Sequence, residues 1–148
     1  MKRKIFFNIC IFIIISLCSF MIEHTLLKSK KKCNKTNEVL SNIVSFIHNM
    51  GSMYITFGSL LFGHYVLHFI ALIMTLFSWY ICNKIDNKKV SCIITQIYNR
   101  LCGFDEGRHF HDLNYYIFNR ILGIQNYSIA LMLCIVLYDL YHIYFIFF

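Results

Sequence analysis

The fold is decided by one stretch, VLSNIVSFIHNMGSMYITFGSLLFGHYVLHFIALIMTLFSWYIC, which covers residues 39–82. This stretch of 44 residues contains no Lys, Arg, Asp or Glu. As a single helix it would be about 66 Å long, roughly twice the hydrocarbon thickness of a bilayer. We therefore expect it to fold back near Gly58, Ser59 and Gly63, which gives membrane spans over residues 39–61 and 64–82.

Two more apolar runs flank this stretch. Residues 5–22 and 128–148 are each close to the length that crosses a hydrocarbon core of about 30 Å. The first run follows the basic segment Met1–Lys4 and is either an uncleaved signal anchor or a signal peptide cut near Ser16-Leu17-Cys18. We favour the anchor because the run continues beyond that point. The four runs predict an all-α, polytopic integral membrane protein that forms a single membrane domain over residues 1–148.

The first half of the charge-free stretch is the weakest of these spans. Polar and small residues interrupt it, and its start also fits an amphipathic helix lying in the membrane interface. Three spans are therefore the alternative to four. Four spans place 11 of the 14 Lys and Arg residues on one side of the membrane. The positive-inside rule then favours four spans, with both termini outside and a cytoplasmic region over residues 83–127.

Residues 83–127 form the only sizeable polar region of the chain. Apolar residues recur at helical spacing within residues 90–101 and again within residues 113–124. This periodicity predicts two short amphipathic helices. The two glycines of residues 103–107 predict a turn between them.

The composition supports this class of protein. Hydrophobic residues make up 58% of the chain and charged residues 14%, against about a quarter charged in a soluble domain. The net charge is +7, but the Lys and Arg residues flank the apolar runs. That is the pattern of charge beside a membrane, not of a nucleic-acid-binding surface. The expected partners are the lipid bilayer, anionic lipids at the basic loops and further copies of the chain in a homo-oligomer.

One part of the chain, residues 79–103, resembles a known group of proteins. Trp79 stands at the end of a span, Asn83 and Asn87 follow in a polar turn, and Cys92-Ile93-Ile94-Thr95 leads a short helix that ends at Leu101-Cys102-Gly103. This arrangement resembles uncharacterised small multi-spanning membrane proteins of large DNA viruses. The resemblance implies a membrane location and no particular activity.

The seven cysteines are spread along the chain without a Cys-x-x-Cys pair. We therefore expect neither a zinc site nor a disulfide framework. Cys33 and Cys82 lie beside spans, where palmitoylation is the alternative to the free, inert thiol that we expect. The glycosylation sequons at Asn34 and Asn126 fall in loops expected to be cytoplasmic, so we expect both to be unmodified.

Four polar residues lie within the predicted spans. His64 and His68 are four residues apart, and Asp139 and His142 are three apart, so each pair shares a helix face. Chain direction puts both pairs toward the same side of the membrane, which predicts one intramembrane polar cluster. An ionised Asp near mid-bilayer costs about 2.5–3.5 kcal/mol on insertion scales, so we expect Asp139 to be paired or protonated.

Some of these residues are also candidate metal ligands. His64 and His68 can share a metal or haem if both lie on one helix face, and His109, His111 and Asp112 form a second candidate group in the polar region. We favour a structural explanation for the first pair, in which His64 faces water and His68 hydrogen-bonds across helices with Asp139, and a solvated loop explains the second group. We therefore expect no resident metal or cofactor.

The sequence favours a protein without catalytic activity. It contains no nucleophile elbow, P-loop, dinucleotide fingerprint or His-Glu-x-x-His helix. We expect a small multi-pass membrane protein with a structural or interaction role. One alternative is a self-assembling ion or proton conductor, based on Asp139 and a small-residue contact at Ser59 and Gly63. The other is a membrane metal or haem protein with histidine ligands.

Overall fold

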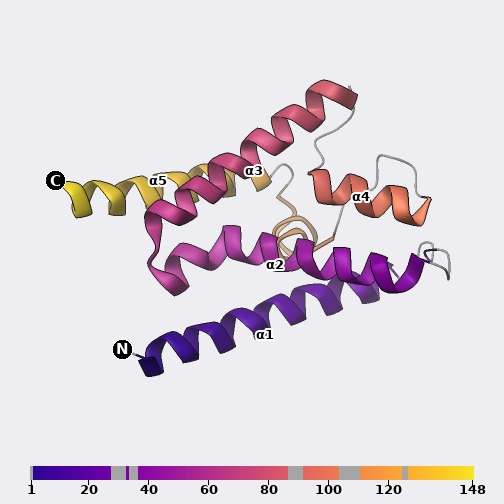
Figure 1. The fold of residues 1–148 in the computed structure, drawn as a ribbon, viewed down its shortest axis with the longest axis horizontal. Helices are drawn as coiled ribbons and strands as arrows, with labels where there is room; N and C mark the ends of the chain where they lie inside the picture. The colour runs from indigo at the N-terminus through magenta and orange to yellow at the C-terminus, as the bar shows by residue number, and fades with distance from the viewer. Residues whose placement is uncertain (1, 28–32, 34–36, 87–91, 104–110, 125–126) are drawn as a thin grey trace.

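The computed structural model describes residues 2–27, 33, 37–86, 92–103, 111–124 and 127–148. Every regular element within these ranges is a helix, so the expected all-α class is confirmed (Figure 1). In chain order the elements are α1 (Lys2–Leu27), α2 (Glu38–Phe62), α3 (Tyr65–Asp86), α4 (Ile93–Cys102), the π-helix η2 (Tyr115–Ile121) and α5 (Tyr127–Phe147).

Three helices are long and apolar enough to cross a membrane. They contain the segments Arg3–Thr25 of α1, Tyr65–Cys82 of α3 and Tyr127–Phe147 of α5. These segments coincide with the spans expected over residues 5–22, 64–82 and 128–148. The fourth long helix, α2, has 25 residues but carries too many polar side chains to join this set. Length and composition therefore support a membrane protein.

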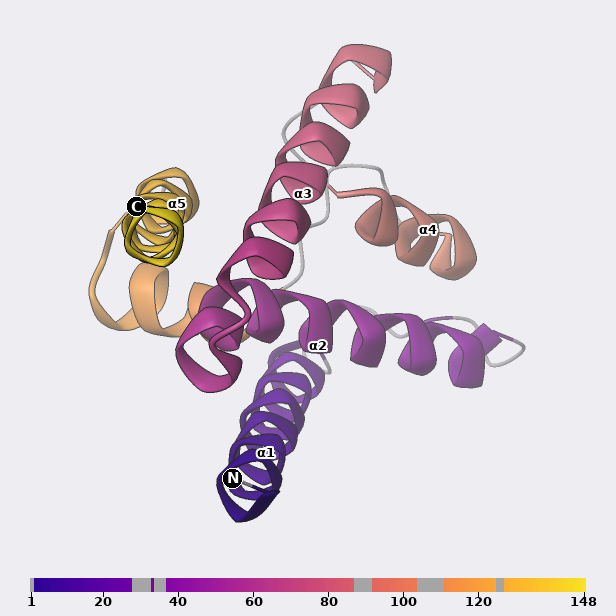
Figure 2. The same ribbon diagram turned by 60° about the vertical axis from the view of Figure 1, so that its left-hand side comes forward.

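Helix α2 lies at the centre of the arrangement. It packs against α1 along much of its length and also contacts α3, α4 and α5. In Figure 1 the N-terminus, the C-terminus and the connection between α2 and α3 all lie toward one end of the molecule. Figure 2 shows α4 and α5 on opposite sides of α3. The chain thus runs back and forth along the long axis, with α2 antiparallel to α1.

The reversal between α2 and α3 falls at Gly63. This glycine has a φ of 68°, and its backbone N–H donates to the carbonyl of Ser59 at 3.0 Å. A left-handed residue of this kind ends many helices, and glycine adopts the conformation without the steric cost of a Cβ. Gly58 and Ser59, which were expected to mark the turn with Gly63, instead lie within α2 and are buried. Ser59 is buried in α2 and Gly63 lies just after that helix. The two residues therefore do not form the exposed small-residue contact face that was considered for self-assembly.

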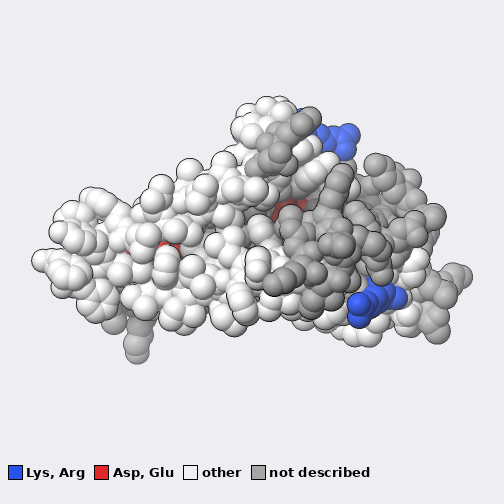
Figure 3. All heavy atoms as spheres, turned by 90° about the horizontal axis from the view of Figure 1, so that it is seen from above, with Lys and Arg blue, Asp and Glu red and all other residues white. Residues whose placement is uncertain are grey.

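Buried polar side chains lie in the interface between α1 and α2, beside aromatic contacts such as that of Phe20 with Phe46. The buried residues there are Ser16, Ser19 and Glu23 of α1 and Ser41, Ser45 and Asn49 of α2. The outward faces of both helices are apolar, with exposed residues such as Phe6, Ile14, Ile43 and Ile47. This is the reverse of a water-soluble helix pair. Among the residues that the structure describes, Figure 3 shows the same property over one face of the molecule, where few Lys and Arg side chains are visible and Asp and Glu appear only in hollows.

The interface between α3 and α5 is mainly apolar, apart from the buried pair His68 and Asp139. Leu72 of α3 packs with Met132 and Ile135 of α5 in the largest buried hydrophobic cluster of the described residues. Partly buried apolar side chains surround these three, among them Trp79 and Leu131. The molecule therefore has two different interiors, one polar and one apolar, on either side of α2.

The polar region folds close to the sequence expectation but not identically. The helix expected over residues 90–101 is α4, and the helix expected over residues 113–124 is the π-helix η2. Helix α4 ends at Gly103, which has a φ of 63°. The rest of the turn expected over residues 103–107 lies outside the described residues, as do the sequon residues Asn34 and Asn126.

The expectation that Cys33 is a free thiol is wrong. Cys33 and Cys102 form a disulfide, with a Cα–Cα distance of 4.6 Å and a separation of 69 positions in sequence. The amide of Asn37 also donates to the carbonyl of Leu101 at 2.9 Å. The sequence pattern missed this pairing because neither cysteine belongs to a recognisable motif. The consequence is that the segment before α2 is bonded to the end of α4.

Candidate functional site

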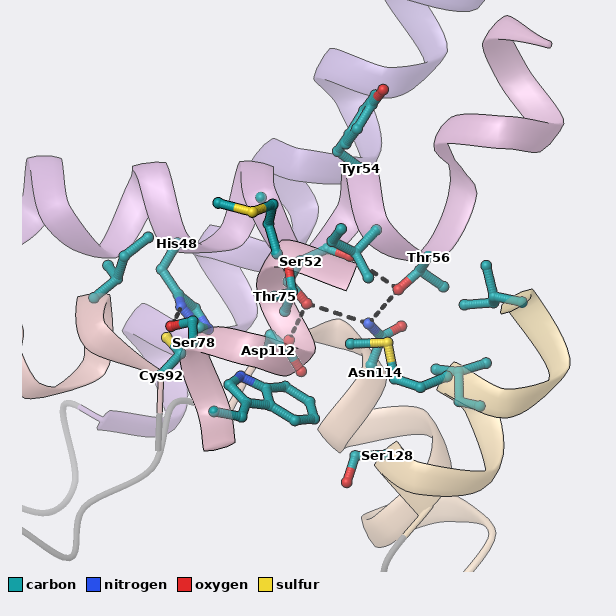
Figure 4. Close-up of a pocket in the computed structure, with 18 of the residues that line it drawn as sticks. His48, Ser52, Tyr54, Thr56, Thr75, Ser78, Cys92, Asp112, Asn114 and Ser128 are labelled. Carbon is teal, nitrogen blue, oxygen red and sulfur yellow. Dashed lines mark hydrogen bonds between the residues drawn. The ribbon is translucent and has the colours of Figure 1, made fainter. Parts of the chain in front are cut away.

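A pocket of about 430 Å³ lies between α2, α3, the start of α4, α5 and residues 112–114. Its apolar wall comes mainly from α3 and α5, with Met74, Trp79, Leu131 and Ile135 among the lining residues. Its polar wall comes from α2, α4 and residues 112–114, and Figure 4 shows these side chains pointing toward one another. Pockets that bind small molecules have volumes of about 300–1,000 Å³ and the same combination of apolar walls and a few converging polar groups.

His48 and Cys92 form one part of the polar wall. The Sγ of Cys92 lies 3.6 Å from Nδ1 of His48, 3.2 Å from Oγ1 of Thr95 and 3.4 Å from the backbone nitrogen of Thr95. Cys92 is the N-cap of α4, so its sulfur accepts the Thr95 N–H at the positive end of the helix dipole. A cysteine beside a histidine at a helix N-terminus is a pattern that activates thiols.

The charges around this pair favour the thiolate. Burial alone would raise the pKa of the Cys92 thiol, but the hydrogen bond and charge of His48, together with hydrogen bonds from Thr95, lower that pKa to about 7. A positive charge on His48 would therefore stabilise a thiolate at Cys92.

Asp112 and Asn114 form the second part of the polar wall. The hydroxyl of Ser52 donates to Oδ2 of Asp112, and the amide of Asn114 donates to Oγ1 of Thr56 at 2.8 Å. Oδ1 of Asp112 also accepts the backbone N–H of Tyr115 at 2.9 Å, which ties the start of η2 to α2. These bonds hold both polar side chains in fixed positions beside the cavity (Figure 4).

A buried polar network continues from this wall into the α1–α2 interface. The hydroxyl of Ser45 donates to Oε2 of Glu23 at 2.7 Å, and the amide of Asn49 donates to the same oxygen. The hydroxyl of Ser19 donates to Oδ1 of Asn49 and accepts the backbone N–H of Leu113 at 3.0 Å. The network therefore joins α1, α2 and the segment that carries Asp112.

His68 and Asp139 form a separate buried pair. Their side chains are 0% exposed, and Nδ1 of His68 lies 2.6 Å from Oδ2 of Asp139. Nε2 of His68 lies 3.0 Å from the carbonyl oxygen of Tyr54, which can only accept, so Nε2 carries a proton. The remaining proton lies either on Nδ1 or on the carboxyl group. The pair is neutral overall in both arrangements, which lowers the cost of burying it.

The other two members of the predicted intramembrane cluster lie elsewhere. His64 is exposed, next to the turn at Gly63. His142 is partly buried and stacks on the ring of Tyr65, with 4.3 Å between centroids and 5° between planes. The structure thus brings together the side chains of His68 and Asp139. His64 meets His68 through its backbone carbonyl, which accepts the His68 N–H at 2.9 Å within the first turn of the helix.

The candidate metal ligands do not converge within the described part of the chain. No group of three His, Cys, Asp or Glu side chains in the described ranges has the geometry to hold a metal ion. His109 lies outside those ranges. The ring of His111 contacts that of Tyr115 in a tilted arrangement, with 4.3 Å between centroids, and Asp112 uses both carboxylate oxygens in hydrogen bonds.

Sequence reasoning missed Glu23, His48, Asn49 and Cys92 as site residues. Glu23 was assigned to a loop because it ends the first apolar run, although Ser16, Ser19 and Glu23 follow helical spacing. Ser41, Ser45 and Asn49 recur every four residues and signal one polar face of α2.

Comparisons with protein families, with curated proteins and with solved structures give no match.

Proposed function

We propose that this chain is a small multi-pass membrane protein that crosses the bilayer four times and has an interaction role: it binds an amphipathic molecule with one long apolar chain. The pocket is the observation that carries this proposal. Its apolar wall suits a hydrocarbon chain, and the side chains of His48, Cys92 and Asp112 suit a polar head. The proposal of four crossings rests on two separate observations, described next.

The first observation is the distribution of side chains on α2. Ser41, Ser45 and Asn49 are buried against α1, whereas Leu40 and Ile43 are exposed. Exposed apolar side chains are unfavourable in water but favourable in a lipid environment, where polar groups must find partners inside the protein. Helix α2 therefore suits a bilayer although its overall composition is too polar for a typical span.

The second observation is the disulfide between Cys33 and Cys102. Helices α2 and α3 are the two long helices between these cysteines in the chain. Two cysteines in one disulfide lie on the same side of a membrane, so α2 and α3 either both cross it or both fail to cross. Because α3 is long and apolar enough to cross, α2 should cross as well.

The disulfide also bears on the orientation. Disulfides persist in oxidising compartments and are rare in the cytosol. We therefore propose that the end with Cys33 and Cys102 faces an oxidising compartment and that both termini are cytoplasmic. The basic residues Lys2–Lys4 at the start of α1 agree with this orientation, whereas the count of Lys and Arg residues over all loops favours the opposite one.

Reporter fusions test the number of crossings and the orientation separately. A reporter before Met1 and one after Phe148 should lie in the same compartment, and one inserted after Asn87 should lie in the other. Opposite locations for the two terminal reporters would contradict four crossings. Cytoplasmic signals at both termini would support the proposed orientation, and exoplasmic signals at both would reverse it without changing the number of crossings.

Binding in the pocket is tested by photo-crosslinking. Purified protein in phospholipid nanodiscs is irradiated with a photoreactive long-chain fatty acid, and the modified residues are located by mass spectrometry. Leu131→Trp should fill the pocket and reduce labelling, whereas Leu133→Trp is the matched control because Leu133 is exposed on the same helix. Equal labelling of both variants, or labelling only on outward faces, would contradict the proposed pocket.

Proton transfer is the second candidate function, because the buried carboxylates of Glu23 and Asp139 lie near opposite ends of the polar face of α2. Each keeps one oxygen without a hydrogen-bond partner among the described residues. Liposomes with an internal pH dye test this function directly. A proton flux that disappears in Asp139→Asn and in Glu23→Gln would support it, and a flux no greater than in protein-free liposomes would exclude it.

A further inference from the structure

We propose that Cys92 accepts a long-chain acyl group as a thioester, with His48 acting on the thiol and the pocket holding the chain. This inference rests on the proposed pocket function and extends it from reversible binding to covalent attachment. The acyl group would come from an activated acyl donor, either a thioester or a phospholipid ester. Cys92 is thus assigned as an acylation site, and His48 as the residue that handles its proton.

The geometry brings three requirements for acyl transfer together. The nucleophile, Sγ of Cys92, lies at the pocket wall, and the base, Nδ1 of His48, lies 3.6 Å away. The sulfur also accepts the Thr95 N–H at the start of α4. The adjoining apolar wall, with Trp79 and Ile135, would hold a chain whose carboxyl carbon lies next to the sulfur. A bound chain raises the effective concentration of the carbonyl at the thiol.

The reaction balances without a redox partner. His48 takes the proton of the Cys92 thiol, and the sulfur attacks the carbonyl carbon of the donor. The new bond between the Cys92 sulfur and that carbon is kept, and the bond between the carbon and the leaving oxygen or sulfur breaks. The leaving alcohol or thiol then takes the proton from His48. The products are S-acyl Cys92 and the free alcohol or thiol.

The electrostatic surroundings agree with this role. The groups that face the pair are Thr95 on α4, Asp112 before η2 and Glu23 on α1. The pKa of Cys92, lowered to about 7, makes about half of the thiol ionised at pH 7, against a few per cent for an ordinary cysteine with a pKa of about 8.5. The acylation rate should therefore fall as the pH drops below 7, because protonation removes the nucleophile.

The remaining cysteines lack this combination. Cys33 and Cys102 are joined in the disulfide, and Cys82 is buried. Cys10 is partly buried on α1, Cys18 and Cys134 are exposed on the outer faces of their helices, and none of the three lines the pocket. Cys134 is therefore an internal control for non-specific acylation within the same molecule.

The test uses the full chain in nanodiscs with two acyl donors in separate arms. One arm supplies an alkyne-tagged palmitoyl thioester of coenzyme A, and the other supplies a phosphatidylcholine with an alkyne-tagged chain. We expect hydroxylamine-sensitive label on Cys92 in at least one arm, at least about fivefold above Cys134. The arm that labels identifies the donor. Label on Cys134 at the same rate as on Cys92, or no label in either arm, would overturn the proposal.

Two variants test the assigned roles. Cys92→Ser should remove the label, and His48→Asn should slow labelling at least about tenfold, because the amide can keep a hydrogen bond but cannot take a proton. Unchanged labelling in His48→Asn would overturn the role of the histidine. Size-exclusion profiles and helical content would show that both variants fold.

Photo-crosslinking of the wild-type chain without an acyl donor separates this proposal from the pocket function. If the wild-type pocket binds the photoreactive fatty acid while the chain takes no acyl group from either donor, covalent attachment is wrong and the pocket function stands. If wild-type Cys92 is acylated while no probe enters the pocket, the acceptor stands and the pocket function is wrong. Loss of both activities would overturn both.

Discussion

The interface between α1 and α2 and the interface between α3 and α5 solve the same packing problem in opposite ways. The first buries Ser19, Glu23 and Asn49 in a hydrogen-bonded network. The second buries Leu72 and Met132 in an apolar cluster. Both present apolar side chains outward. The polarity of the buried face therefore does not show whether a helix can lie in lipid. The polarity of its outward face does, because that face contacts the surroundings.

This difference has a physical reason. In a bilayer, lipid chains are as apolar as Leu side chains, so burying apolar groups between helices gives little driving force. Close packing and hydrogen bonds between helices remain. The α1–α2 interface relies on hydrogen bonds, and the α3–α5 interface relies on packing with one polar pair, His68 and Asp139. The two interfaces should therefore respond differently to substitutions.

The largest effect should come from breaking the disulfide beside the polar interface. Replacing both Cys33 and Cys102 by Ser should destabilise the protein by about 3–4 kcal/mol, because the bond closes a long loop and restricts the unfolded chain. The measurement is the midpoint of SDS-induced unfolding in detergent micelles. Cys18→Ser is the control, since Cys18 is exposed and free. An equal midpoint for the double variant and the control would contradict a structural role for this bond.

The second prediction compares the destabilisation caused by one substitution in the α1–α2 interface with that caused by one substitution in the α3–α5 interface. Asn49→Leu should cost about 2–4 kcal/mol, because it leaves Glu23 and Ser19 without partners in a buried network. Leu72→Ala should cost about 1–3 kcal/mol, because it leaves a cavity that neighbouring side chains fill only in part. Unfolding in mixed micelles measures both. A larger loss for Leu72→Ala would mean that packing dominates in both interfaces.

Much of the fold was predictable because helices in membranes leave a strong pattern. The charge-free stretch of residues 39–82, its reversal and three apolar spans follow from length, charge and glycine placement alone. The sequence could not show which face of α2 is buried. An amphipathic pattern is the same whether its polar face meets water or α1, and only the contact with Glu23 distinguishes the two.

The candidate site was predictable only in part. His68 and Asp139 are polar residues in apolar runs and therefore stand out, and they meet in the structure. His48 and Cys92 are 44 residues apart and lie in segments without a motif, so only their contact reveals them. The pairing of Cys33 with Cys102 was missed for the same reason. Contacts between distant polar residues depend on how the helices pack.

A third prediction concerns the one polar pair next to the apolar interface. Asp139→Leu and His68→Leu should each be destabilising, because each leaves the other side chain buried without its partner. The double variant should be more stable than the sum of the two single effects predicts, with a coupling of about 1–3 kcal/mol. A double-mutant cycle by thermal unfolding in detergent measures this coupling. Strictly additive effects would show that the contact contributes nothing.

The smallest effect should appear at the two glycines within α2. A Cβ at Gly58 would lie 2.9 Å from Cδ2 of His68 and 2.9 Å from ring carbons of Tyr54, whereas a Cβ at Gly51 would meet nothing within 4 Å. Gly58→Ala should therefore cost about 1–2 kcal/mol, because His68 is held on both sides by hydrogen bonds and cannot shift freely. Gly51→Ala should be neutral or stabilising by up to about 1 kcal/mol, since alanine is the better helix former.

Substitutions at Gly58 and Gly51 also show whether His68 causes the destabilisation expected for Gly58→Ala. In a His68→Ala background the clash with the imidazole is absent, so Gly58→Ala should lose most of its effect, while Gly51→Ala should behave as before. SDS-induced unfolding of the four combinations measures this. If Gly58→Ala remains equally destabilising without His68, the strain arises from Tyr54 within α2 itself. The close approach of α2 and α3 at Gly58 would then not be what positions the buried pair.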